Sequence, residues 1–274
     1  AISPRLAMRI LVSTDRHTCR MDPAGATRLV EWPDGWRVHH VRETGSTNTD
    51  LLRMAADGAP DRTVVYADHQ TAGRGRLDRR WDAPPGANLL VSLLFRNPPA
   101  HRHELTQRVA LAAADAAFEV AGVDASLKWP NDLLVGSAKL AGVLAQGAGD
   151  HVVVGLGLNV GWAPPGAARL GDSMSVAGTL ATLLAAYDRL PTDVHPLYRS
   201  RLATIGRRVR VELPASVIEG RAVGVGADGR LAQPPRPPLR RHPPRARFRS
   251  HSRGARRLRP RCRTDCELAD GSTD

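Results

Sequence analysis

The chain has 274 residues, of which 42% are hydrophobic and 24% are charged, and its formal net charge is +12. These proportions are typical of folded domains and exclude a wholly disordered chain, and the length suffices for one large domain or two smaller ones. No apolar run reaches the roughly 18 residues of a membrane-spanning helix, the first residues lack a signal-peptide pattern, and three cysteines are too few for a disulfide framework. We therefore expect a cytoplasmic protein without a membrane segment.

The positive charge is unevenly distributed along the chain. Residues 1–40 and residues 41–233 each carry a net charge of +2, whereas residues 234–274 contain 12 arginines and four acidic residues and carry +8. A strongly basic chain suggests a nucleic-acid partner. Here that suggestion depends on the C-terminal segment alone, because the rest of the chain is nearly neutral.

The predicted elements alternate between strands and helices over residues 37–205. Period-two and apolar segments predict strands, and segments with a helical apolar period predict helices. The expected strands cover residues 36–41, 63–67, 88–95, 126–129, 139–146 and 151–160. The expected helices cover residues 50–57, 104–121, 176–190 and 194–203, and Gly122 is placed to end the second of them. This order predicts an α+β fold with a mixed, largely antiparallel sheet.

The segments on either side of this domain differ in character. Residues 1–36 have no clear period, so we expect a poorly ordered N-terminal extension. Residues 206–233 contain short strand patterns around an Asp228-Gly229 turn and predict a small, incomplete β domain. Residues 234–274 are rich in proline and arginine and have no apolar period, so we expect a disordered tail there.

The most informative motif lies between the strands predicted at 63–67 and 88–95. It reads Gln70-Thr-Ala-Gly-Arg-Gly-Arg-Leu-Asp-Arg-Arg-Trp81. Gly73 and Gly75 permit close approach of the backbone to a ligand, and the arginines are forked donors that suit phosphate or carboxylate oxygens. A solvated basic loop and an RNA-binding Gly-Arg segment are the alternatives for these residues taken alone. The position of the motif between two strands favours a site for a small anion.

Later motifs supply lysines and an acidic side chain. In Leu127-Lys-Trp-Pro-Asn-Asp132, Lys128 suits a phosphate and Asp132 suits Mg²⁺ or a hydroxyl, although Pro-Asn-Asp is also typical of an ordinary turn. Lys139 leads into an apolar strand, a position that is often a solvated strand end. Gly155-Leu-Gly-Leu-Asn159-Val-Gly161 is not a dinucleotide-binding motif, because its third glycine falls one place late.

Together with Gly45-Ser46-Thr47-Asn48, these motifs resemble the biotin–protein ligase (biotin–[acetyl-CoA-carboxylase] ligase) family over about residues 41–230. The resemblance implies a class II synthetase-like catalytic domain followed by a small C-terminal β domain. It also implies a two-step, AMP-forming reaction in which biotin and ATP give biotinyl-5′-adenylate, whose acyl group passes to a lysine of a carrier domain. Adenylation joins two anions, so arginine and lysine side chains are needed to offset their charge.

The resemblance also implies roles for individual residues. The residues expected to bind biotin are Ser46, Thr47, Asn48, Gln70, Gly73, Arg74, Gly75, Arg76, Lys139 and Gly142. Those expected to bind ATP are Arg76, Arg79, Trp81, Lys128, Asn131, Asp132 and Asn159, with Asp132 as the Mg²⁺ ligand. The expected catalytic residues are Arg74, Arg76, Lys139 and Asp132. The implied protein partner is the biotin carboxyl carrier domain of an acetyl-CoA or acyl-CoA carboxylase.

The sequence departs from the family pattern in three places. Leu77 stands where many relatives have another basic residue. The residues before the catalytic part are too few and too aperiodic for the winged helix that binds operator DNA in some relatives, so we expect no DNA partner. The abrupt change of composition after Gln233 suggests a shifted reading frame or a divergent end.

Two other functions stay open at this point. A lipoate– or octanoate–protein ligase would share the fold and would activate a related acid. A non-enzymatic protein could instead bind nucleic acid through its arginine-rich tail.

Overall fold

The computed structural model describes residues 17–21, 27–147, 149–213, 216–232 and 266–268 of the chain. These residues fall into two compact units. One reaches Ala203 and includes residues 227–229, and the other contains Thr204–Gly226 and the residues from Arg230 onward. In the described part of the chain, no helix is both long enough and apolar enough to cross a membrane.

The first unit is built on a seven-stranded sheet with the strand order β3-β4-β5-β9-β8-β7-β6. The strands are β3 (Arg37–Thr44), β4 (Thr63–Gln70), β5 (Leu89–Arg96), β6 (Ser126–Lys128), β7 (Asp132–Val135), β8 (Ala138–Gln146) and β9 (His151–Leu158). Only β3 and β4 are parallel, and helix α1 (Thr47–Ala56) makes the crossover that parallel strands require. The other neighbouring pairs are antiparallel. The predicted α+β fold with a mixed, largely antiparallel sheet is therefore confirmed.

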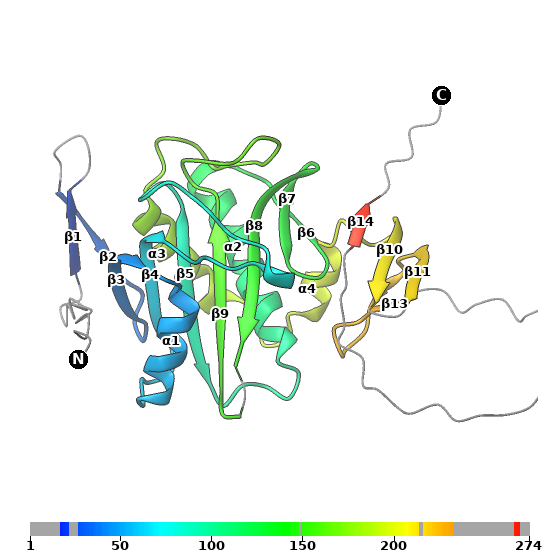
Figure 1. Cartoon of the computed structure of the whole chain (residues 1–274), viewed down its shortest axis with the longest axis horizontal. Coiled ribbons are helices and arrows are strands. Elements are labelled where there is room, and N and C mark those ends of the chain that lie inside the picture. The colour runs from blue at the N-terminus through cyan, green and yellow to red at the C-terminus, as the bar shows by residue number, and fades with distance from the viewer. Residues whose placement is uncertain (1–16, 22–26, 148, 214–215, 233–265, 269–274) are drawn as a thin grey trace, which may run out of the picture. The chain divides into compact units, whose positions relative to one another are not determined.

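Helices cover the two faces of this sheet, as Figure 1 shows. On one face, Leu94 of β5 lies in a buried cluster with Leu51 of α1. The next residue, Phe95, stacks on Tyr187 of α3 (Val176–Arg189) at a centroid distance of 5.4 Å. Because consecutive strand residues point to opposite faces, α1 and α3 lie on opposite sides of the sheet. Both faces of β5 are therefore buried, which explains its continuous apolar sequence.

The long helix α2 (His103–Ala121) packs against α3, and a short helix, α4 (His195–Ser200), follows α3 in the chain. Gly122 follows α2 with a φ of 66°, in the left-handed region that favours glycine. The predicted end of this helix is confirmed.

The second unit is a small β structure. Its strands are β10 (Arg208–Leu213), β11 (Ser216–Arg221), β12 (Gly224–Val225), β13 (Leu231–Ala232) and β14 (Cys266–Leu268). β10 pairs with both β11 and β14, and β12 pairs with β13. Val209, Val211 and Ala222 form its small buried core.

Several elements differ from the sequence prediction. Helix α1 begins at Thr47 and not at residue 50, because the Asp50 N–H already donates to the Ser46 carbonyl at 3.0 Å. The turn covers residues 129–131, so the strand predicted to reach Trp129 ends at Lys128 and Asp132 already begins strand β7. We did not predict β7, which contains the buried pair Leu133 and Leu134. The structure also has an antiparallel pair, β1 (His17–Met21) with β2 (Thr27–Glu31), in a segment where we expected no regular elements. Similarly, β14 lies in the arginine-rich tail.

Candidate functional site

Three glycines lie on the sheet face that α1 covers. Gly142 on β8 is directly opposite Gly157 on β9, and Gly155 on β9 is opposite Ser92 on β5. A Cβ on Gly155 would lie 2.3 Å from Asn48 Oδ1, and a Cβ on Gly157 would lie 2.4 Å from the Trp81 ring. Real Cβ atoms do not make such contacts, so only glycine fits at these two positions. We did not assign Gly155 or Gly157 to the site, although two glycines spaced to share one strand face are a signal of close approach.

The beginning of α1 brings four predicted residues together. Ser46 is the N-cap residue, and Thr47 and Asn48 form the first turn, with all three side chains buried. The Thr47 main-chain N–H and its hydroxyl both donate to Gln70 Oε1, at 2.8 and 3.1 Å. Gln70 is the last residue of β4, so the crossover from β3 to β4 explains how residues far apart in sequence meet.

Asn48 is held by residues that the sequence prediction missed. Its Nδ2 donates to Gln146 Oε1 at 2.7 Å and to the Leu144 carbonyl at 3.3 Å. Ser92 Oγ lies 2.5 Å from Asn48 Oδ1 and 2.7 Å from Thr47 Oγ1. Neither Ser92 nor Gln146 had a distinguishing signal of its own, because an isolated serine or glutamine on a predicted strand is common.

The arginine-rich motif folds back on itself. The Trp81 N–H donates to the Gly73 carbonyl at 3.0 Å, and the Gly75 N–H donates to the Arg79 carbonyl at 2.6 Å. A Cβ on Gly73 would lie 2.3 Å from the Trp81 carbonyl oxygen, so this closure needs glycine. Arg74 and Arg79 are exposed on the loop.

Arg76 connects the arginine-rich loop to Asn131, the residue directly before strand β7. A guanidinium nitrogen of Arg76 donates to Asn131 Oδ1 at 3.2 Å. Asn131 is itself fixed to β8, because its Nδ2 donates to the Val143 carbonyl at 2.8 Å and its own carbonyl accepts from the Val143 N–H. The loop motif and the Lys-Trp-Pro-Asn-Asp motif therefore meet through one side-chain pair.

Trp81 lies over the opposed glycines Gly142 and Gly157. The Lys139 ammonium is 5.6 Å from the centre of its ring. The Trp81 Nε1 atom is buried and has no hydrogen-bond partner in the described part of the chain.

Strand register places charged residues in a row next to these glycines. Lys128 on β6 pairs with Asp132 on β7, Asp132 pairs with Gly142 on β8, and Gly142 pairs with Gly157 on β9. Lys139 Nζ lies 2.7 Å from Asp132 Oδ1, and these side chains are 41% and 23% exposed. The row brings two cations and one carboxylate to the glycine-lined face, an arrangement that suits a ligand with several anionic oxygens.

Asn159, which we expected to bind ATP, has a buried side chain that hydrogen-bonds to other parts of the protein. It is buried, and its Nδ2 donates to the carbonyls of Lys139 and Ala168 at 3.3 and 2.9 Å. Its Oδ1 accepts from Asn88 Nδ2 at 3.3 Å. The side chain therefore connects the β8 backbone beside Lys139 to the loop after β9.

The described residues contain no group of three or more His, Cys, Asp or Glu side chains that could hold a metal ion. Asp132 is the one carboxylate in the row described above. A Mg²⁺ ion that arrives with a nucleotide commonly uses only one or two protein carboxylates, so this donor set fits a nucleotide-borne ion and not an all-protein metal cage.

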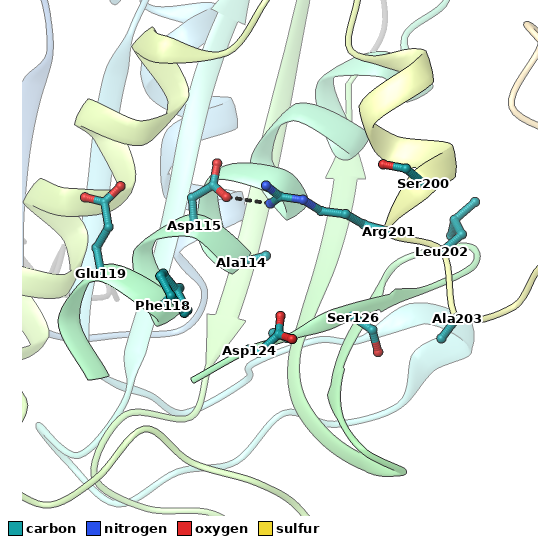
Figure 2. Close-up of a pocket in the computed structure, with 11 residues that line it drawn as sticks. Ala114, Asp115, Phe118, Glu119, Asp124, Ser126, Ser200, Arg201, Leu202 and Ala203 are labelled. Carbon is teal, nitrogen blue, oxygen red and sulfur yellow. Dashed lines mark hydrogen bonds and ion pairs between the residues drawn. The ribbon is translucent and has the colours of Figure 1, made fainter. Parts of the chain in front are cut away.

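Figure 2 shows a separate pocket of about 510 Å³ between α2, β6 and residues 200–203. Arg201 and Asp115 form an ion pair at 2.5 Å in its wall, and Phe118 is 63% exposed beside it. The described residues that line this pocket include none that the sequence predicted to bind a ligand.

Comparisons with known proteins point to one family. Residues 41–159 match the model of the biotin/lipoate A/B protein ligase family, and residues 204–232 match the biotin protein ligase C-terminal domain. The biotin–[acetyl-CoA-carboxylase] ligase of Mycobacterium tuberculosis is 40% identical over 228 residues, which cover 74% of this chain and 86% of that protein. The ligase of the same name from Paracoccus denitrificans is 37% identical over 133 residues, which cover 45% of this chain and 55% of that protein.

A solved structure is similar as well. The biotin protein ligase from Aquifex aeolicus, determined in complex with biotin and ATP, has a TM-score of 0.62 and 27% sequence identity. The match covers 71% of this chain and 90% of that one. The structural similarity therefore extends well beyond the short motifs.

Proposed function

The chain belongs to the biotin/lipoate A/B protein ligase family, and from this premise we infer that it is a biotin–[acetyl-CoA-carboxylase] ligase. The observation that carries this conclusion is the 40% identity to the Mycobacterium tuberculosis ligase over 86% of that protein's length. The reaction has two steps. The biotin carboxylate attacks the α-phosphorus of ATP and displaces pyrophosphate, and a lysine amine then attacks the acyl carbon and displaces AMP.

We propose that the buried polar residues at the start of α1 hold the ureido end of biotin. Thr47, Asn48 and Gln70 already share one hydrogen-bond network, so their polar atoms are ordered before a ligand enters. Preorganised polar groups bind with less loss of conformational entropy. The full proposed set for biotin is Ser46, Thr47, Asn48, Gln70, Gly73, Arg74, Gly75, Arg76, Lys139 and Gly142.

The first step of the reaction brings two anions together, and this suggests roles for the lysine and arginine side chains. Lys139, Arg74 and Arg76 offset the charge of the carboxylate and of the α-phosphate as the two anions approach. Lys128, Asn131, Arg79 and Trp81 serve the nucleotide. Asn159 acts through its bonds to the β8 backbone beside Lys139. Folding of the arginine-rich loop over the ligand would keep water from the reactive anhydride.

Asp132 is the residue that would hold Mg²⁺ delivered with ATP. Bound Mg²⁺ would neutralise negative charge on the phosphates. Asp132 Oδ1 also lies 2.7 Å from the Lys139 ammonium, so the two side chains balance each other's charge.

The reaction also suggests which protein group accepts biotin and in which cell compartment the protein acts. The acceptor is a lysine of a biotin carboxyl carrier domain, and an acetyl-CoA or acyl-CoA carboxylase is the proposed source of that domain. The need for ATP and the small number of cysteines both favour the cytoplasm.

Biotin-dependent exchange of radiolabelled pyrophosphate into ATP tests this function, because it reports the first step without a carrier protein. We expect exchange with biotin and none with lipoate or octanoate in parallel reactions. Exchange with lipoate and not with biotin would mean that the chain is a lipoate ligase of the same family. A folded protein that gives exchange with none of the three acids would contradict the assignment.

Replacing Arg76 with alanine is expected to weaken retention of the adenylate. The change removes the donor that links the loop to Asn131, so loop and sheet would no longer be joined over the ligand. One charge-assisted hydrogen bond contributes about 1.5–3 kcal/mol, which corresponds to roughly 10- to 150-fold faster release of labelled biotinyl-adenylate on a filter. Arg42→Ala, which changes an exposed arginine on β3, is the matched control. Equal release rates for Arg76→Ala and the control would count against this role.

A further inference from the structure

The carboxamide of Asn48 is fixed by partners from two strands, β8 and β5. Both hydrogens of its Nδ2 have acceptors, Gln146 Oε1 at 2.7 Å and the Leu144 carbonyl at 3.3 Å. Its Oδ1 accepts from Ser92 Oγ at 2.5 Å. Asn48 is only 6% exposed and Ser92 is fully buried, so the bond between them is shielded from water, whereas Gln146 and Leu144 are partly exposed. Gln146 lies near the end of β8, 98 residues from Asn48 in sequence.

The partners also decide which way the carboxamide faces. A main-chain carbonyl can only accept a hydrogen bond, so the Asn48 atom that faces Leu144 must be the nitrogen. Gln146 must then present its oxygen to the second hydrogen of that nitrogen. Asn48 has no N–H left for a ligand, whereas its oxygen, with two lone pairs, accepts from Ser92 alone among the described residues. The residue therefore offers an acceptor and no donor.

Gln70 differs from Asn48 in the end of its carboxamide that is available to a ligand. Its Oε1 accepts from both the N–H and the hydroxyl of Thr47, so its NH₂ group is the end that can donate to a ligand. The network thus combines one acceptor at Asn48 with donors at Gln70. A cyclic urea has the complementary groups, N–H donors and a carbonyl acceptor, whereas a dithiolane or an alkyl chain has neither.

We propose that Gln146 is a positioning residue: by accepting from the second Nδ2 hydrogen, it holds the Asn48 carboxamide in the orientation that the Leu144 carbonyl sets, with its oxygen free to accept, and so helps to select ligands with a ureido N–H. This proposal rests on the proposed biotin-activating function. Gln146 touches the ligand only through Asn48. Loss of its oxygen would remove the shorter of the two bonds made by the Asn48 nitrogen and would leave the Leu144 and Ser92 bonds alone to oppose rotation of the carboxamide.

The test compares Gln146→Met, which has a similar shape without the amide oxygen, with Gln146→Glu, which retains an oxygen acceptor. In biotin-dependent pyrophosphate exchange, we expect Gln146→Met to raise the KM for biotin about tenfold with kcat changed less than twofold. Gln146→Glu should restore a KM near that of the unchanged protein. Gln146→Ala is the second truncation if the methionine variant does not fold, as judged by thermal unfolding.

A second measurement uses biotin methylated at one or the other ureido nitrogen. The unchanged protein should discriminate strongly against the derivative that lacks the N–H facing Asn48, and the Gln146→Met protein should discriminate at least fivefold less. Unchanged KM and discrimination in Gln146→Met, or a glutamate variant that behaves like the methionine variant, would overturn the proposal. Absence of exchange in the unchanged protein would instead contradict the proposed function, so the two failures are distinguishable.

Discussion

Replacing Lys139 with glutamine is expected to lower the rate of biotin-dependent pyrophosphate exchange by about 100- to 1000-fold, the usual effect of removing one preorganised donor from developing negative charge. Lys139 is placed for this role because its ammonium lies next to Asp132 and close to the glycine-lined face. It is 3.2 Å from the position that a Cβ on Gly142 would occupy. Glutamine keeps most of the length of the side chain and an N–H donor, but it carries no charge.

Two further variants make the Lys139 result interpretable. Lys139→Arg retains the charge but not the compact shape, so we expect partial activity between the glutamine variant and the unchanged protein. Arg42→Gln removes an exposed cation from β3 and should leave exchange unchanged. If Lys139→Gln retained more than a tenth of the rate while remaining folded, Lys139 would not be the main source of charge stabilisation.

The sequence patterns predicted most of the fold because the core elements follow simple periods. The apolar run at 88–95 and the alanine-rich segment at 104–121 gave β5 and α2 nearly to the residue. The strand β7 was missed because it has only four residues and follows a turn-forming Pro-Asn pair. Tertiary pairing with β6 and β8 makes so short a strand stable, and no local pattern contains that information.

The candidate site was only partly predictable for a related reason. Motif residues such as Gln70 and Lys139 are candidates because their motifs resemble those of the family. The row Lys128–Asp132–Gly142–Gly157 exists only through the register of four strands, which the motifs do not specify. Likewise, Gln146 meets Asn48 only when β8 and α1 lie on the same part of the sheet. Sequence reasoning thus proposes groups that react or bind but does not reach the groups that orient them.

Substituting alanine for Gly155 is expected to raise the KM for biotin about 5- to 150-fold. The added Cβ would lie 2.3, 2.9 and 3.1 Å from the Oδ1, Cγ and Nδ2 atoms of Asn48. Asn48 cannot turn away without losing its bonds to Ser92, Gln146 or Leu144. Overpacking a fixed site costs about 1–3 kcal/mol, which gives this range of affinity when the cost falls on the ligand-binding geometry.

Two further variants test the prediction for Gly155→Ala: a control at another glycine and a double variant with Asn48. Gly178→Ala, in α3 on the opposite face of the sheet, should leave the KM for biotin unchanged, because its added Cβ would meet only Ser175 among its nearest atoms. In the double variant Gly155→Ala with Asn48→Ser, the two effects should be less than additive, because the smaller serine removes the atoms that the new methyl group meets. Fully additive effects, or an unchanged KM in folded Gly155→Ala, would show that the Asn48 carboxamide does not set the biotin-binding geometry. The three heavy atoms nearest to that Cβ all belong to Asn48, so the coupling between these two positions decides whether the loss arises there.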